Sequence, residues 1–173
     1  MKEFLLALLA TGAFGSVLEW IIHRHIMHDP RFKLAFRRHT LEHHSHRRAP
    51  GQYYAKCEAE REYHLFETSY MPVVFLANTP YYLLWFWLAG QGGALGAVVG
   101  TAGYIITYEL LHWAMHSASR LREVALFRFL CEHHRRHHRR ARINYNVVCP
   151  LGDLLFGTFS FEKIPPEPED THD

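Results

Sequence analysis

The sequence predicts an all-α integral membrane protein with about three transmembrane helices and a cytoplasmic, histidine-rich helical cap. Three observations lead to this prediction: long stretches almost free of charge, basic residues confined to the segments between them, and histidines clustered where those stretches end. The length of 173 residues suits one domain. We assign residues 1–163 to a single membrane-embedded domain, and residues 164–173, rich in proline and acidic side chains, to a disordered tail.

The predicted spans follow from charge and length. Residues 4–22 contain one charged side chain, residues 69–89 contain none, and residues 92–111 contain one. About 20 helical residues cover the roughly 30 Å hydrocarbon core of a bilayer, so each stretch is long enough to cross it. A soluble bundle of fully buried helices is the alternative, but such helices rarely run this long without charge.

The basic residues orient the chain. Of its 19 lysines and arginines, nine lie between positions 24 and 61 and nine from position 120 onward, whereas residues 90–93 contain none. By the positive-inside rule, the N-terminus then lies outside and both histidine-rich segments lie in the cytoplasm. The net charge of +2 is too small to indicate a nucleic-acid partner. A cleaved secretory signal at the N-terminus is the alternative, and it would place the histidines outside.

The segments around the spans carry local signals. Asp29 and Pro30 end the first helix, because the residue before a proline avoids helical geometry. Residues 52–67 mix charged and aromatic side chains, a pattern typical of a surface helix. Pro72 and Pro80 predict a bent second span.

Two further stretches connect these elements. The glycine-rich residues 90–100 predict a tight outer turn and close helix packing. Residues 121–130 are too short to span and alternate apolar with charged side chains, which predicts a helix in the plane of the interface. The three cysteines are odd in number and lack CxxC spacing, which suits a reducing compartment.

The candidate metal ligands are eleven histidines in four clusters at the cytoplasmic ends of the spans. Neutral imidazole binds iron, zinc, copper and nickel, and a structural zinc site normally uses about four ligands. This number of candidates therefore predicts two metal ions with positions left open for a small molecule, which indicates catalysis. The candidates are His23, His28, His39, His43, His44, His112, His116, His133, His134, His137 and His138.

Helical spacing suggests how these ligands divide. His112 and His116 are four residues apart, so both rings lie on one helix face and reach one metal region. His39 and His43 share a face in the same way. His44 turns about 100° away from His43, toward a neighbouring ion.

The other two clusters leave alternatives open. His23 and His28 are five residues apart and not strictly on one face, so we expect a distortion of the helix end to bring them together, with His25 as a spare ligand. In the last cluster either His133 or His134 supports the site rather than binding metal. Whether His46 ligates stays open, while the isolated His64 is expected to be a bystander and His172, in the predicted tail, is a weak candidate.

Ligand histidines usually donate their second nitrogen to a carboxylate or a carbonyl, which fixes the tautomer. We expect no catalytic side chain beyond the metal centre itself. Glu109 and Asp153 are the preferred supporting residues, since an acid within a span indicates function by default. For Glu19, pairing with water or arginine at the interface is an equal alternative. The full set of supporting candidates is Glu109, Asp153, Asn144, Glu19, Glu42 and Glu132.

Five motifs occur in order along the chain: HRHIMH at 23–28, HTLEHH at 39–44, HWAMH at 112–116, HHRRHH at 133–138 and NYNVVCPLGDLLFGT at 144–158. With these motifs the sequence resembles the fatty acid hydroxylase and sterol desaturase superfamily of integral membrane oxygenases. The first motif also resembles that of carotenoid hydroxylases. The resemblance covers residues 19–158, with Asn146 where family members commonly carry glycine and Leu154 where an aromatic residue is common.

The resemblance implies a centre of two iron ions held by histidines, O2 as co-substrate and an external electron donor, either a ferredoxin or a cytochrome b5-like protein served by a separate reductase. Zinc is able to replace iron during purification, because it binds nitrogen sites more tightly than Fe(II) does. The implied substrate is a membrane lipid: a fatty acyl, sphingolipid, sterol-like or carotenoid molecule.

The sequence therefore predicts O2-dependent hydroxylation of a lipid C–H bond. Desaturation of a lipid by the same centre is an alternative that the sequence does not separate from hydroxylation. A non-catalytic metal-binding or metal-transport protein is disfavoured, since transport needs polar groups through the bilayer and these histidines stop at one face. The oligomeric state stays open.

Overall fold

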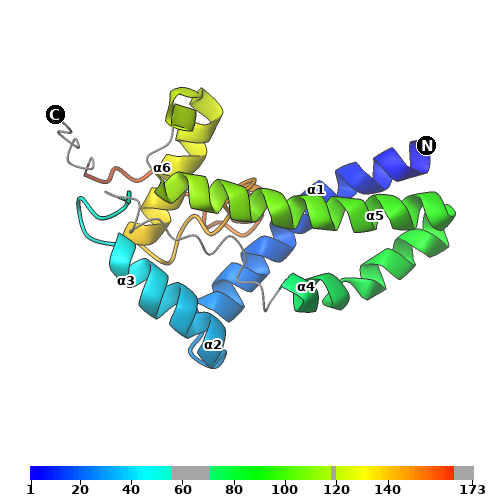
Figure 1. The fold of residues 1–173 in the computed structure, drawn as a ribbon, viewed down its shortest axis with the longest axis horizontal. Coiled ribbons are helices and arrows are strands. Elements are labelled where there is room, and N and C mark those ends of the chain that lie inside the picture. Colours follow the sequence, from blue (N-terminus) through cyan, green and yellow to red (C-terminus); the bar gives the residue numbers. More distant parts are fainter. Residues whose placement is uncertain (56–70, 118–119, 166–173) are drawn as a thin grey trace.

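The computed structural model describes residues 1–55, 71–117 and 120–165. Within these ranges the chain is all-helical, as the sequence predicts (Figure 1). Two π-helices, η1 and η2, and one 3-10 helix, η4, interrupt the α-helices. The elements are α1 (Lys2–Ile22), η1 (His23–Met27), α2 (Lys33–Phe36), η2 (Arg37–His43), α3 (His44–Arg47), α4 (Met71–Ala77), α5 (Thr79–His116), η4 (Arg120–Glu123), α6 (Ala125–Arg139) and α7 (Leu151–Leu155).

Two helices are long and apolar enough to cross a membrane. They are Lys2–Met27, which joins α1 and η1, and Thr79–His116, which is α5. The helical pattern of α5 breaks at Ala89 and Gly90, and the chain turns back there (Figure 1). Gly90 has φ of 63°, in the left-handed region that glycine adopts without steric cost.

The predicted second and third spans lie on the two sides of this turn. The second is broken again at Asn78, between α4 and α5, in agreement with the bend predicted from Pro72 and Pro80. Since only two helices within the described ranges qualify as candidate spans, the number of three crossings stays a prediction.

Helices α1 and α5 pack against each other through small residues. A Cβ atom built on Gly96 would overlap the backbone carbonyl of Phe4, and one on Gly100 would lie 2.8 Å from Cβ of Thr11. Ala7 and Ala97 are fully buried in the same region. The close helix packing predicted from the glycine-rich stretch is confirmed, because only residues without a larger side chain let the two backbones approach this far.

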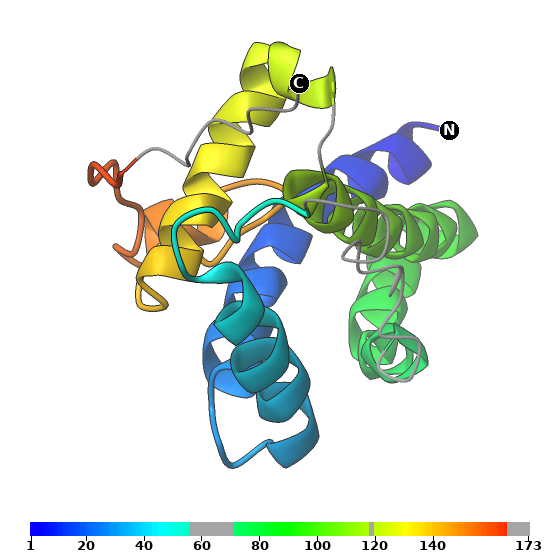
Figure 2. The ribbon, with the colours of Figure 1, turned by 60° about the vertical axis from the view of Figure 1, so that its left-hand side comes forward.

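The cap lies at the end of α1 and α5 away from the N-terminus (Figures 1 and 2). After Pro30 the chain turns back through α2, η2 and α3, while α7 packs on α1. The predicted interfacial helix at 121–130 is wrong in extent: α6 begins at Ala125 and continues through the fourth histidine cluster to Arg139. It is strongly amphipathic and buries Phe127 and Leu130, so core packing sets its position.

Other sequence-based expectations fall outside the described residues. Most of the predicted surface helix at 52–67 lies there, with His64, and so does the tail beyond Pro165, with His172. The domain boundary at residue 163 therefore stays a prediction.

Candidate metal centre

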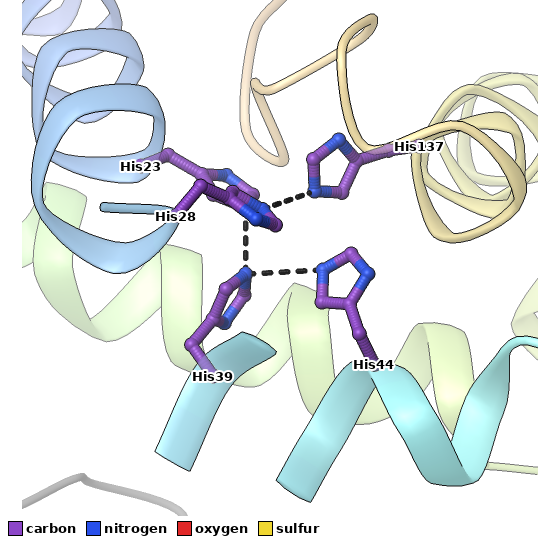
Figure 3. A group of neighbouring side chains, drawn as sticks. All are labelled: His23, His28, His39, His44 and His137. Atoms are coloured by element: carbon purple, nitrogen blue, oxygen red, sulfur yellow. Dashed lines mark hydrogen bonds between the residues drawn. The ribbon is translucent and has the colours of Figure 1, made fainter. Parts of the chain in front are cut away.

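Ten of the eleven predicted histidine ligands converge into two groups of five. Within each group, one ring nitrogen of every histidine lies within 4.8 Å of one ring nitrogen of every other. Eight of the ten rings are buried, and His28 and His112 are partly exposed. The first group is His23, His28, His39, His44 and His137 (Figure 3). The second group is His43, His112, His116, His134 and His138.

The two π-helices explain which residues join the first group. The His28 N–H donates to the His23 carbonyl at 3.2 Å, a hydrogen bond across five residues that stacks the two side chains on one face. This is the distortion expected for that pair. In η2 the same spacing joins His39 to His44. The prediction that His39 and His43 share a helix face toward one group is therefore wrong, because they lie in different groups. His43 instead faces the second group.

Ordinary helical spacing supplies most of the second group. His112 and His116 on α5 are four residues apart, as are His134 and His138 on α6, and each pair lies on one helix face. His137 precedes His138 by one residue, so its ring points to the first group. Helix α6 therefore carries ligands for both groups.

In the first group the Nε2 atoms point inward (Figure 3). His23 and His39 have Nε2 atoms 2.8 Å apart. The corresponding distance is 3.2 Å for His39 and His44, and 3.0 Å for His28 and His137. Four helical segments thus aim the same ring atom at one point.

The second group repeats this arrangement. The Nε2 atom of His134 lies 3.2 Å from that of His116 and 3.0 Å from that of His138. The rings of His44 and His138 stack at 4.2 Å between centroids, so the two groups are direct neighbours. This arrangement suits two ions placed side by side.

Backbone carbonyls hold the outer nitrogens of several rings. A ring that donates from Nδ1 to a carbonyl keeps a lone pair on Nε2, which is the form that binds a metal ion. His23 and His137 both aim such lone pairs into the first group, and a cation held between them would remove the repulsion between these lone pairs. The Nδ1 partners are Tyr145 for His23, Ile143 for His137 at 2.8 Å and Tyr53 for His116 at 3.1 Å.

The cap also keeps these rings neutral. Burial, followed by the neighbouring histidines, lowers the pKa of five buried rings of the cap well below its ordinary value, and lowers the pKa of the partly exposed His28 to about 4. Metal binding needs the deprotonated imidazole, so the ligands are in their binding form at neutral pH. The buried rings concerned are His39, His44, His134, His137 and His138.

The number and spacing of the nitrogens suit a metal site. The Nε2 atoms of five ring pairs lie 2.8 to 3.2 Å apart, close to the roughly 3.0–3.4 Å between neighbouring nitrogens that lie about 2.1 Å from one ion. Each group would offer five nitrogens, one more than the four ligands of a closed tetrahedral zinc site.

His133 lies outside both groups. Its Nε2 atom donates to Oδ2 of Asp153 at 3.0 Å, and both side chains are fully buried. Asp153 also accepts from the Tyr145 backbone N–H at 2.8 Å. Burial alone would raise the pKa of Asp153, but its hydrogen bonds outweigh this effect and hold the pKa below its ordinary value. Since the Tyr145 carbonyl binds His23, Asp153 supports the first group through the backbone.

Residues of the 144–158 motif connect the histidine groups to α1 through hydrogen bonds. Asn144 adopts the left-handed conformation with φ of 55°, and its amide donates to the His133 carbonyl at 3.2 Å. Asn146, at the position where glycine is common in the family, donates to the Ser16 carbonyl at 2.8 Å. It joins the motif directly to α1, a role that its departure from the family pattern did not reveal.

The remaining predicted supporting residues have other positions. Glu19 accepts from the Tyr104 hydroxyl at 2.6 Å and from the Val147 backbone N–H. Glu109 lines the cavity described below, Glu42 is exposed, and Glu132 pairs with Arg135. The spare ligands His25 and His46 are exposed and belong to neither group.

A cavity of about 280 Å³ extends from the first group between α1, α4 and α5. His23 lines it, together with Met27 and Ala35 from the cap and Leu18 from α1. Most of its other lining side chains are aliphatic or aromatic, with Glu19, Asn78 and Glu109 among the polar exceptions, as in a site for an apolar ligand. A long apolar molecule in this cavity would therefore lie against the first histidine group.

Long apolar helices that carry two groups of inward-facing histidines at one end define a membrane protein with a histidine-rich metal site. The family model of fatty acid hydroxylases matches residues 7–158, and the chain belongs to the fatty acid hydroxylase family. No curated protein and no solved structure shows a significant match. The family is one of membrane oxygenases that depend on iron in general, so the chain is an oxidoreductase.

Proposed function

We propose that the protein hydroxylates a lipid C–H bond with O2 at a centre of two iron ions, one in each histidine group. One observation carries this proposal: five inward-facing nitrogens converge at each of two adjacent points, beside an apolar cavity, in a chain of the fatty acid hydroxylase family. When bound, two iron ions would supply the activation of O2 needed to oxidise an unactivated C–H bond.

The side chains of the protein hold and orient this centre. Carbonyls of Tyr53, Ile143 and Tyr145 fix the tautomers of three ligands, and the buried Asp153 fixes the loop that carries Tyr145. The apolar cavity excludes water and places a hydrocarbon chain against His23. A lipid is able to enter it from the bilayer without passing through water.

Electrons come, in this proposal, from a separate reductase through a ferredoxin or a cytochrome b5-like donor. Insertion of one oxygen atom from O2 into a C–H bond reduces the other atom to water, and this consumes two electrons and two protons from outside. The basic cap, on the cytoplasmic face by the positive-inside rule, offers a surface for an acidic donor.

The experiment that tests the function combines metal analysis with lipid analysis. The wild-type protein, purified anaerobically in mild detergent, is expected to contain two iron ions per chain, and cells that express it should accumulate a lipid with one added oxygen atom. His112→Ala should remove the product and lower the metal content, whereas the matched variant His46→Ala, at an exposed ring outside both groups, should change neither.

Other outcomes would point elsewhere. A lipid that has lost two hydrogen atoms instead of gaining oxygen would indicate a desaturase with the same centre. Bound metal with an unchanged lipid profile, in cells that also express a reductase and its electron carrier, would contradict catalysis and favour a metal-binding protein. Bound zinc alone would not contradict the proposal, because zinc displaces Fe(II) from nitrogen sites.

A further inference from the structure

We propose that the cavity holds the lipid with its methyl end inward, so that the protein selects the carbon to be oxidised by its distance from the methyl end and not from the head group. This inference rests on the proposed hydroxylase function. It depends on three features: the shape of the cavity, its closed end, and the placement of charge around it.

The cavity is a narrow slot along α1. Its lining runs from His23 through Leu18 to Thr11 on one side, and along α5 from Glu109 to Thr101 on the other. The twelve residues from His23 to Thr11 correspond to about 18 Å of helix. A volume of about 280 Å³ spread over this length leaves room for one extended hydrocarbon chain.

The slot ends where α1 and α5 meet. Beyond Thr101 the two helices touch at Gly100 and Gly96, where even a Cβ atom would collide with α1. The Thr11 hydroxyl bonds to the Tyr81 hydroxyl at 3.1 Å, and the Tyr81 ring stacks on Phe14 at 4.1 Å. These contacts close the end that lies deepest in the helix pair.

The opposite end of the slot lies beside the cap. Met27 and Ala35 line the slot there, together with His23. The first histidine group therefore lies at the cap end of the slot, at a fixed distance from the closed end.

Charge decides which end of a lipid enters. Among the lining residues the only basic side chain is His23, whereas Glu19 and Glu109 are acids. A carboxylate or phosphate head group has no cationic partner inside the slot, and burying it unpaired is costly. Outside, the exposed Lys33 at the start of α2 lies two residues from the lining residue Ala35, whereas the exposed Arg31 is paired with Asp29. The head group stays there, and the methyl end enters.

The consequence is a fixed distance between the methyl end of the substrate and the oxidised carbon. A chain that reaches the closed end presents the carbon about 18 Å from its methyl group to the first histidine group, whatever its total length. Lengthening the substrate by two carbons should then move the oxidised position two carbons farther from the head group. A site that recognised the head group would instead keep the oxidised carbon at a constant distance from the head group.

The experiment uses the full-length, iron-loaded protein with its electron donor in detergent, supplied with saturated fatty acids that differ in length by two carbons. Mass spectrometry locates the oxidised carbon in each product. A constant distance from the methyl end supports the inference. A constant distance from the carboxyl group overturns it while leaving the hydroxylase function intact.

A variant tests the closed end directly. Thr101→Leu fills the end of the slot, so the chain should sit farther out and the oxidised carbon should move one or two positions toward the methyl end. Val99→Leu is the matched control, because Val99 lies two residues away on α5, is 44% exposed and does not line the slot. An unchanged position in Thr101→Leu would contradict the inference.

A second pair of variants covers the case in which Thr101→Leu does not fold. Val74→Phe narrows the slot from α4, and Leu76→Phe is its control on the same helix, 67% exposed and outside the lining. The expected result is again a shift toward the methyl end for the lining variant alone.

Chain binding is also measurable without turnover. The melting temperature of the iron-loaded protein should rise with fatty acid length up to a limit, and the limit should be shorter in Thr101→Leu than in Val99→Leu. The absence of any oxidised product would contradict the proposed function, and the melting series would still test how the chain lies. A melting temperature that rises with fatty acid length without limit would overturn the inference. The same limiting length in both variants would also overturn it.

Discussion

At the scale of single residues, the contrast between neighbouring histidines is the most informative feature of the site. His133 and His134 are adjacent and both fully buried, yet only His134 has its ring nitrogen in a group of five. His133 points instead to Asp153. Of the two alternatives that the sequence left open, this geometry favours His134 as the ligand, because of the direction of one helix face.

This contrast gives the first prediction. His137→Ala should lower the metal content from two ions to about one per chain, because it removes a ligand from the first group. His133→Ala should keep both ions and instead lower the free energy of unfolding by roughly 1–3 kcal/mol, because it removes a buried hydrogen-bond partner of Asp153. Metal analysis and thermal unfolding of the two variants measure these effects.

The control for this pair is His25→Ala, at an exposed ring outside both groups, which should change neither quantity. Equal metal loss in the variants at positions 133 and 137 would show that His133 is a ligand.

The second prediction concerns pH. Burial holds the pKa values of His39 and His44 well below the ordinary value near 6.5, and lowers the pKa of His28 to about 4. Below about pH 6.5 the unfolded chain therefore binds more protons than the folded one, so stability falls as the pH falls from there toward 4. Metal affinity should fall in the same direction, since protons compete for the ring nitrogens.

Melting temperature and bound metal, both measured between pH 8 and 4, check this expectation. A protein whose stability rises as the pH falls through this range would contradict it.

At the scale of elements, small residues in α5 determine how closely it approaches α1. The third prediction compares two glycines of this helix. Gly96→Ala should destabilise the protein by about 1–3 kcal/mol, because its Cβ would overlap the Phe4 carbonyl and force the helices apart. Gly103→Ala is the matched control, and it should be neutral or stabilising by up to ~1 kcal/mol, since the added methyl meets nothing and alanine favours the helix.

Thermal unfolding in detergent measures both effects. Equal melting temperatures for the two alanine variants would show that the helix pair is not held at Gly96.

The π-helices also act at the scale of elements, because they decide which histidines fall into the same group. Ideal α-helical geometry assigns His39 and His43 to one ion and leaves His23 and His28 apart. The π-helical turns replace four-residue spacing with five-residue spacing and so select His44 and His28. The sequence indicated this only at the first cluster, where five-residue spacing near Pro30 already required a distortion.

At the scale of the whole molecule, the orientation of the chain in the membrane has the widest consequences. The fourth prediction is that the histidine-bearing cap is cytoplasmic and the turn at Gly90 is outside. In a cysteine-free background, Gln91→Cys should react with a membrane-impermeant maleimide in intact cells, and Ser45→Cys should react only after permeabilisation. Both positions are exposed, so access depends on the side of the membrane alone.

Labelling of Ser45→Cys in intact cells would reverse the orientation. Labelling of both positions from the same side would reduce the number of crossings.

The sequence by itself determined the helical class, the apolar character of α1 and α5 and the four histidine clusters, and it named Asp153 among six candidate supporting residues. These features are local: charge, apolar length and helical spacing can be read along the chain, and each persists in the folded protein because burial and backbone hydrogen bonding demand it.

Only the tertiary structure decided how the ligands divide, which ring is left out and what holds the outer nitrogens. The two groups draw on segments from His23 to His138, and π-helical turns change their pairing. Carbonyls of Tyr53, Ile143 and Tyr145 act through the backbone, which every residue has, so no side-chain pattern marks them. The slot beside the centre is likewise lined by α1, α4 and α5 together, so packing between distant segments creates it.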